Sequence, residues 1–86
     1  MSMDAQQLKV EAVSLLSDGM SDILHSRSGL ETHDCADDYE RKAMRLAGHV
    51  HVRHCLGPAN ADLSEAMTAL RVLLLHISEV RKVVKW

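Results

Sequence analysis

Apolar side chains recur at helical spacing in three stretches of this chain, and polar segments rich in Gly, Ser, Asn and Asp separate the stretches. We predict helices over about residues 5–25, 35–56 and 61–85. The sequence shows no alternating strand pattern, internal repeat or low-complexity segment. The pattern therefore predicts an all-α fold in a single domain, residues 1–86.

The first predicted helix follows Asp4 and Gln7, which have the spacing of a capping box. Its apolar positions cover nearly half of the helix circumference: Leu8, Ala12, Val13, Leu15, Leu16, Met20, Ile23 and Leu24. A stripe this wide predicts contact with two neighbouring helices. Gly29 is the expected left-handed stop after this helix.

The second predicted helix takes Asp34 as its cap, and its acidic first turns and basic later turns suit the helix dipole. Gly57 followed by Pro58 predicts its end. One stripe contains the positions expected to face the core: Ala36, Tyr39, Ala43, Leu46, Ala47, Val50 and His54.

The third predicted helix has the most regular pattern, a heptad seam in which apolar residues alternate steps of four and three. The seam consists of Ala66, Leu70, Leu73, Ile77, Val80 and Val84. Asn60 caps the helix, or Asp62 does so with Glu65 as a capping box. Together the three helices predict an up-down-up bundle with one long and one tight connection.

Composition excludes several kinds of partner. The formal charge is −2 and the chain has one Tyr and one Trp, so it lacks the basic surface and the stacking platform with which proteins bind nucleic acid. The apolar run at residues 72–75 is far shorter than the about 20 residues that span a bilayer. No signal-peptide pattern opens the chain. We therefore expect a cytoplasmic protein with no nucleic-acid partner and no membrane span.

Histidine is the unusual residue, because the chain has six. His51, His54 and Cys55 lie within one helical turn, where they could donate two nitrogens and a sulfur to zinc. A tetrahedral site would need a further ligand from another helix, and the two-part spacings of common zinc proteins are missing. In the alternative interpretation His54 lies at the edge of the core, His51 is solvated and Cys55 packs as a small apolar side chain. We favour the alternative and expect no cofactor.

Catalytic groups do not stand out. The acidic residues near the start of the second helix are explained by capping and by the helix dipole. The same acidic residues oppose a lowered pKa for Cys35, which disfavours a reactive thiolate. We therefore expect the protein not to be an enzyme.

A second apolar stripe lies on the third helix, opposite the heptad seam: Thr68, Val72, Leu75, Val83 and Trp86, with Glu79 among them. Several exposed apolar side chains on one face mark an interaction surface. The alternative is that the core register is rotated and this helix is central. We predict that Val72, Leu75, Val83 and Trp86 contact another protein and that the chain forms a homodimer through this helix.

Two functional hypotheses follow from these features. The first is a protein-binding module, an adaptor, chaperone, inhibitor or regulator that occludes a partner's surface. The second is a metal-binding or metal-sensing protein that uses His51, His54 and Cys55. Zinc-dependent folding or assembly would discriminate between them.

Overall fold

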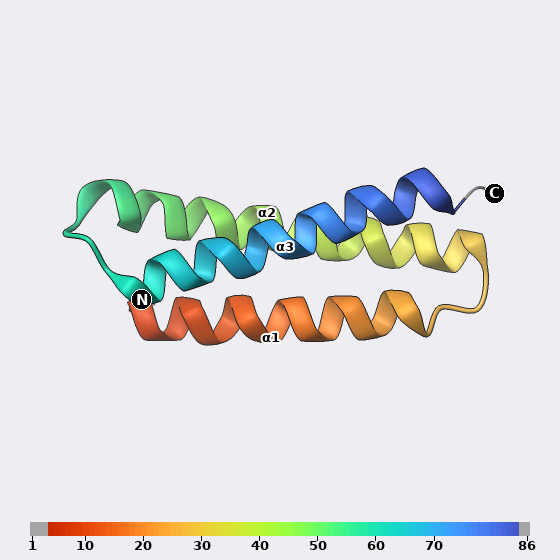
Figure 1. The fold of residues 1–86 in the computed structure, drawn as a ribbon, viewed down its shortest axis with the longest axis horizontal. Helices are drawn as coiled ribbons and strands as arrows, with labels where there is room; N and C mark the ends of the chain where they lie inside the picture. The colour runs from red at the N-terminus through yellow and green to blue at the C-terminus, as the bar shows by residue number, and fades with distance from the viewer. Residues whose placement is uncertain (1–3, 85–86) are drawn as a thin grey trace.

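The structure, a computed structural model, describes residues 4–84. Three helices, α1 (Ala5–Leu24), α2 (Gly29–Leu56) and α3 (Ala61–Val83), form a rod of 44 × 19 × 19 Å. α1 and α3 run in the same direction and α2 runs in the opposite one (Figure 1). Residues 4–84 contain no strand. The predicted up-down-up bundle is confirmed, and the homodimer stays a prediction.

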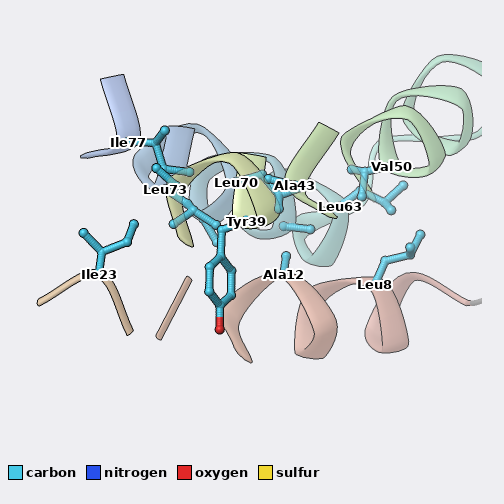
Figure 2. Packing of buried hydrophobic residues seen from close by; sticks show 13 residues of the cluster. Leu8, Ala12, Ile23, Tyr39, Ala43, Val50, Leu63, Leu70, Leu73 and Ile77 are labelled. Atoms are coloured by element: carbon cyan, nitrogen blue, oxygen red, sulfur yellow. The ribbon is translucent and has the colours of Figure 1, made fainter. Parts of the chain in front are cut away.

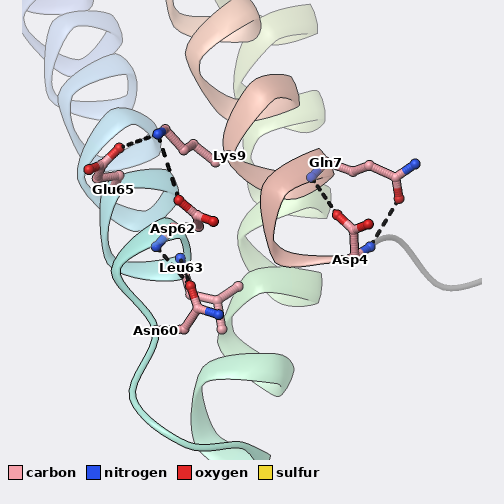
Figure 3. Close-up of polar contacts among 7 residues, drawn as sticks. All are labelled: Asp4, Gln7, Lys9, Asn60, Asp62, Leu63 and Glu65. Atoms are coloured by element: carbon pink, nitrogen blue, oxygen red, sulfur yellow. Dashed lines mark hydrogen bonds and ion pairs between the residues drawn. The ribbon is translucent and has the colours of Figure 1, made fainter.

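The capping box predicted for α1 is present. The backbone N–H of Gln7 donates to Asp4 Oδ1 at 2.8 Å, and the backbone N–H of Asp4 donates to Gln7 Oε1 at 3.0 Å (Figure 3). These two bonds satisfy donors that a helix start leaves unpaired. After Leu24, the Ser26 hydroxyl donates to the carbonyl of Ile23 at 2.7 Å and closes the helix end.

The prediction for the start of α2 was wrong. α2 begins at Gly29, which is its first helical residue rather than a left-handed stop, and Asp34 lies inside the helix. Ser28 Oγ caps α2 by accepting from the backbone N–H of Glu31 at 3.1 Å. Ser28 and Glu31 have capping-box spacing, and this earlier cap takes precedence over Asp34. The connection from α1 is therefore the short segment 25–28 instead of a long loop.

Of the two caps predicted for α3, Asn60 is correct. Its Oδ1 accepts from the backbone N–H of Asp62 at 2.8 Å and of Leu63 at 3.4 Å (Figure 3). The Asp62 carboxylate is thereby left to pair with Lys9, at 3.6 Å. Lys9 also contacts Glu65 at 2.9 Å, so this ammonium joins the starts of α1 and α3.

The core lies along the axis of the rod, where the three apolar stripes meet (Figure 2). The heptad seam of α3 faces it as predicted: Ala66, Leu70, Leu73 and Ile77 are buried, and Val80 and Val84 are half-buried. His54 is exposed, which corrects its predicted place on the core stripe of α2. It follows Val50 by one turn, and the buried residues nearest the starts of α1 and α3 are Leu8 and Leu63. The core therefore ends near Val50 on α2, one helical turn before His54.

Gly19 and Tyr39 determine how closely α1 approaches the other helices. A Cβ atom at the buried Gly19 would lie 2.9 Å from Leu73 Cδ1 and 3.1 Å from Tyr39 Cδ1. The Tyr39 ring points from α2 towards α1 (Figure 2), and its hydroxyl donates to Asp22 Oδ2. This hydrogen bond and the burial of the ring raise the pKa of the Tyr39 hydroxyl.

We predict opposite effects for substitutions of two helical glycines. Gly19→Val would overfill the core beside Leu73 and Tyr39 and should lower the free energy of unfolding by about 1–3 kcal/mol. Gly48→Ala should raise it by about 0.5–1 kcal/mol, because the added Cβ would meet no atom within 4 Å beyond its chain neighbours and the adjacent backbone of its own helix, and alanine favours the helix. Urea unfolding followed by circular dichroism measures both. Equal effects at the two positions would contradict the close packing at Gly19.

We also predict that stability declines at alkaline pH through Tyr39. The folded protein favours the protonated hydroxyl, whereas the unfolded chain releases this proton near pH 10, so the stabilisation is lost as pH rises above about 10. Tyr39→Phe should flatten this part of the profile. The measurement is the urea midpoint from neutral pH to pH 11 for both proteins. Identical slopes would show that lysine titration alone causes the decline.

Candidate functional site

The side of the rod between α1 and α3 carries two shallow hollows with apolar walls. One, of about 370 Å³, lies beside Leu16, Ala69 and Val72. The other, of about 560 Å³, lies between the ends of α1 and α3, beside Leu24 and Val80. Among the described residues that line the two hollows, Glu65 is the one formally charged side chain. The walls of these two hollows are therefore largely uncharged.

The α1 half of this surface was not assigned from the sequence. Lys9 shows which flank of α1 faces α3, because it contacts Asp62 and Glu65. Val13 and Met20 follow Lys9 by four and eleven residues, so they lie on the same flank. Val13 is 47% exposed and Met20 39%. Apolar side chains that were expected to contact neighbouring helices are thus open to solvent.

The α3 half contains two of the predicted interaction residues. Val72 is 42% exposed and lines the same hollow as Leu16. Val83 follows it by three helical turns, which places it in the same row, and is 78% exposed. With the exposed residues of α1 they form what we call the α1/α3 face: Val10, Val13, Met20, Leu24, Val72 and Val83.

Leu75 belongs to a different side of the rod. It is 60% exposed and lines a hollow of about 320 Å³ between α2 and α3, with Ala47, Met67 and Leu74. The predicted stripe on α3 is therefore divided between two sides, because α3 lies against both other helices. Trp86, the fourth predicted interaction residue, lies outside the described residues.

The three residues of the hypothetical zinc site are exposed near the end of α2. Cys55 Sγ lies 3.6 Å from His51 Nε2. His54 is not grouped with them: within residues 4–84, no three His, Cys, Asp or Glu side chains are arranged to hold one metal ion. The structure thus brings together two of the three predicted ligands, and the zinc site stays a prediction.

The acidic residues of α2 form an ion pair with α3. Arg81 donates to Glu40 Oε2 at 2.5 Å and to Asp37 Oδ1. Hydrogen bonds to Glu40 and then to Asp37 raise the pKa of the Arg81 guanidinium. These carboxylates accordingly hold α2 against α3, in addition to suiting the dipole at the start of α2.

The thiol of Cys35 is half-buried between helices. Burial raises its pKa, and the nearby carboxylates, first of all Asp22, raise it further. A raised pKa disfavours the nucleophilic thiolate, in agreement with the expectation from the sequence.

Charged side chains line the side between α1 and α2. The Asp22 carboxylate accepts from Tyr39, and Lys42 pairs with Asp38 at 3.0 Å while lying 5.1 Å from the centroid of the Tyr39 ring. The rod therefore has a polar side between α1 and α2, whereas apolar side chains are exposed between α1 and α3 and, at Leu75, between α2 and α3. Apolar side chains that gather on one face are typical of a surface that other molecules cover.

Comparison of the chain with protein-family models, curated proteins and solved structures gives no match. Within residues 4–84, no helix combines the length and the apolar character needed to cross a bilayer. The function proposed below accordingly depends on the chemistry of the surface.

We predict that aspartate substitutions at Leu75 and Ile77, two residues apart on α3, differ in their effect on folding. Ile77 is 0% exposed, so Ile77→Asp buries a carboxylate and should remove several kcal/mol from a domain that has roughly 5 kcal/mol of stability. Leu75→Asp, at a 60% exposed position, should keep the helical circular-dichroism signal. Unfolding by Leu75→Asp to the same extent would show that the Leu75 hollow is part of the core.

Proposed function

We propose that this protein is a non-enzymatic protein-binding module, an adaptor, chaperone or inhibitor that occludes an apolar surface of a partner with its α1/α3 face. The observation that carries the proposal is the gathering of six exposed apolar side chains on one side of the rod, around two hollows with largely uncharged walls. Two of them, Leu24 and Val83, are 79% and 78% exposed.

Burial of these side chains favours binding. Moving a fully exposed Val, Leu or Met side chain into an apolar contact contributes about 1.5–3 kcal/mol, and a half-buried one contributes less. Leu24 and Val83, the most exposed of the six, therefore contribute most to offsetting an association cost of about 4–15 kcal/mol. The parallel helices α1 and α3 suit an amphipathic helix of a partner, whose apolar side chains would lie along the hollows between them.

We predict that charge on this face abolishes partner capture without unfolding the protein. Val72→Asp and Met20→Asp place carboxylates on the α1/α3 face, while Leu56→Asp, at an 83% exposed position at the end of α2, serves as the matched control. Affinity capture from an extract of the native host, with mass spectrometry, compares the three variants with the unchanged chain. A partner retained by Leu56→Asp and lost by both face variants supports the proposal. A partner retained by all three binds elsewhere.

A second candidate function, metal binding, has one observation in its favour, the contact between His51 and Cys55 at the exposed end of α2. Two further ligands would have to come from His54 and from another chain or segment to complete a tetrahedral zinc site.

We predict that zinc leaves the melting temperature unchanged, because residues 4–84 hold no ready group of three ligands. Calorimetric titration and thermal unfolding, with His51→Ala as control, measure this. Sub-micromolar zinc binding that His51→Ala removes would establish metal binding as the function.

A further inference from the structure

We infer that the occupant of the α1/α3 face is a second copy of this chain, packed face to face with its helices running in the opposite direction. The inference rests on the proposed function in that it names the partner of the same face. It predicts a bundle of four helices at the interface, with α1 against α1 and α3 against α3 of the second copy.

The axial alignment of α1 with α3 within one copy determines which residues contact each other across the interface. Lys9 contacts both Asp62 and Glu65, and Leu16 shares a hollow with Thr68 and Val72. Because the two helices run in the same direction, residues on α3 lie beside residues about 55 positions earlier on α1 (Figure 1). Val10 is thus level with Glu65, Ser17 with Val72 and Leu24 with Glu79.

A second copy in the same direction would pack α1 against α3 of its partner at equal levels. Val10 would then lie over Glu65, and Leu24 over Glu79. Both arrangements bury a carboxylate against an apolar side chain, which costs free energy. The same-direction dimer is therefore disfavoured.

A reversed copy packs α1 against α1 and matches like with like. Val10, Ser17 and Leu24 are spaced by seven residues, so they form one row along α1. With the twofold axis at Ser17, Val10 meets Leu24 of the second copy, the Ser17 hydroxyls face each other, and Val72 meets Val72. The row reads apolar, polar, apolar from either end, which is the self-complementarity that a twofold interface requires.

The reversed arrangement also brings charged residues together, because Glu65 and Glu79 lie seven residues on either side of Val72. Glu65 therefore approaches Glu79 of the second copy. Each carboxylate has a lysine of its own chain, Lys9 at 2.9 Å and Lys82 at 3.2 Å, which reduces the repulsion between them. Antiparallel helices also oppose their dipoles across the interface, which is favourable.

The area of the face fits a dimer of moderate affinity. α1 has 20 residues and is about 30 Å long, and the rod is 19 Å wide. Each copy would bury on the order of 600 Å² and the pair roughly 1,200 Å², at the lower end of specific interfaces. Dimerisation at micromolar concentration is the expected consequence.

Disulfide trapping tests both the partner and its direction. In a background with Cys35→Ala and Cys55→Ser, single cysteines are introduced as Val10→Cys, Ser17→Cys and Leu24→Cys, and folding is checked by circular dichroism. Mild oxidation and non-reducing electrophoresis then follow. We expect Ser17→Cys to link to itself, and Val10→Cys to link to Leu24→Cys in a mixture but neither to itself. In the reversed dimer, residues seven positions from the axis lie about 21 Å from their own counterparts, beyond disulfide reach.

Two results would overturn the inference. Self-linking of both Val10→Cys and Leu24→Cys, without a mixed product, would exclude the reversed direction. Failure of every variant to link, together with a mass of 9.6 kDa by light scattering of the unchanged chain at micromolar concentration, would exclude the second copy. The capture experiment distinguishes this failure from failure of the proposed function: a host protein that is lost on Val72→Asp and Met20→Asp would support the proposed function even where no disulfide link forms.

Discussion

The close approach of α1 to Tyr39 and Leu73, which the absent side chain at Gly19 permits, is the contact on which the shape of this protein depends. With 0% exposure at Leu73 and 8% at Tyr39, no space remains for a larger residue at that point. α1 therefore lies deep in the groove of the helical hairpin formed by α2 and α3. A core of few and small side chains, including Ala12, Ala36, Ala43 and Ala66, suffices because the helices lie so near each other.

The close approach of the helices also determines which apolar side chains stay exposed. An α1 stripe that covers nearly half of the helix is wider than the narrow core can bury, so Val13 and Met20 stay at the surface. On α3 the core takes Leu70, Leu73 and Ile77, which leaves Val72 and Val83 beside them. The α1/α3 face is thus the part of the apolar periodicity that a three-helix core does not use.

The heptad seam of α3 and the capping box of α1 could be predicted from the sequence because both are local patterns with one dominant structural solution. The start of α2 could not, since Ser28 and Asp34 are both competent caps and the choice depends on whether Thr32 and Ala36 are buried by the other helices. The exposed apolar stripe on α3 was also predicted, and Val72, Leu75 and Val83 are exposed, while its role in binding stays a prediction. Its division at Leu75, and its continuation on α1, depend on where the neighbouring helices lie, which periodicity alone does not give.

The direction of the helices has a mechanical consequence. α1 begins at one end of the 44 Å rod and α3 ends at the other, because the bundle has an odd number of helices (Figure 1). A pulling force applied between residues 4 and 84 acts along the helix axes and slides α1 past α3 in shear. Every contact between those helices then resists at once, including the Lys9 pairs with Asp62 and Glu65. A force applied between residues 4 and 57 would have to act across one end of the rod, where it would peel α1 and α2 apart a turn at a time.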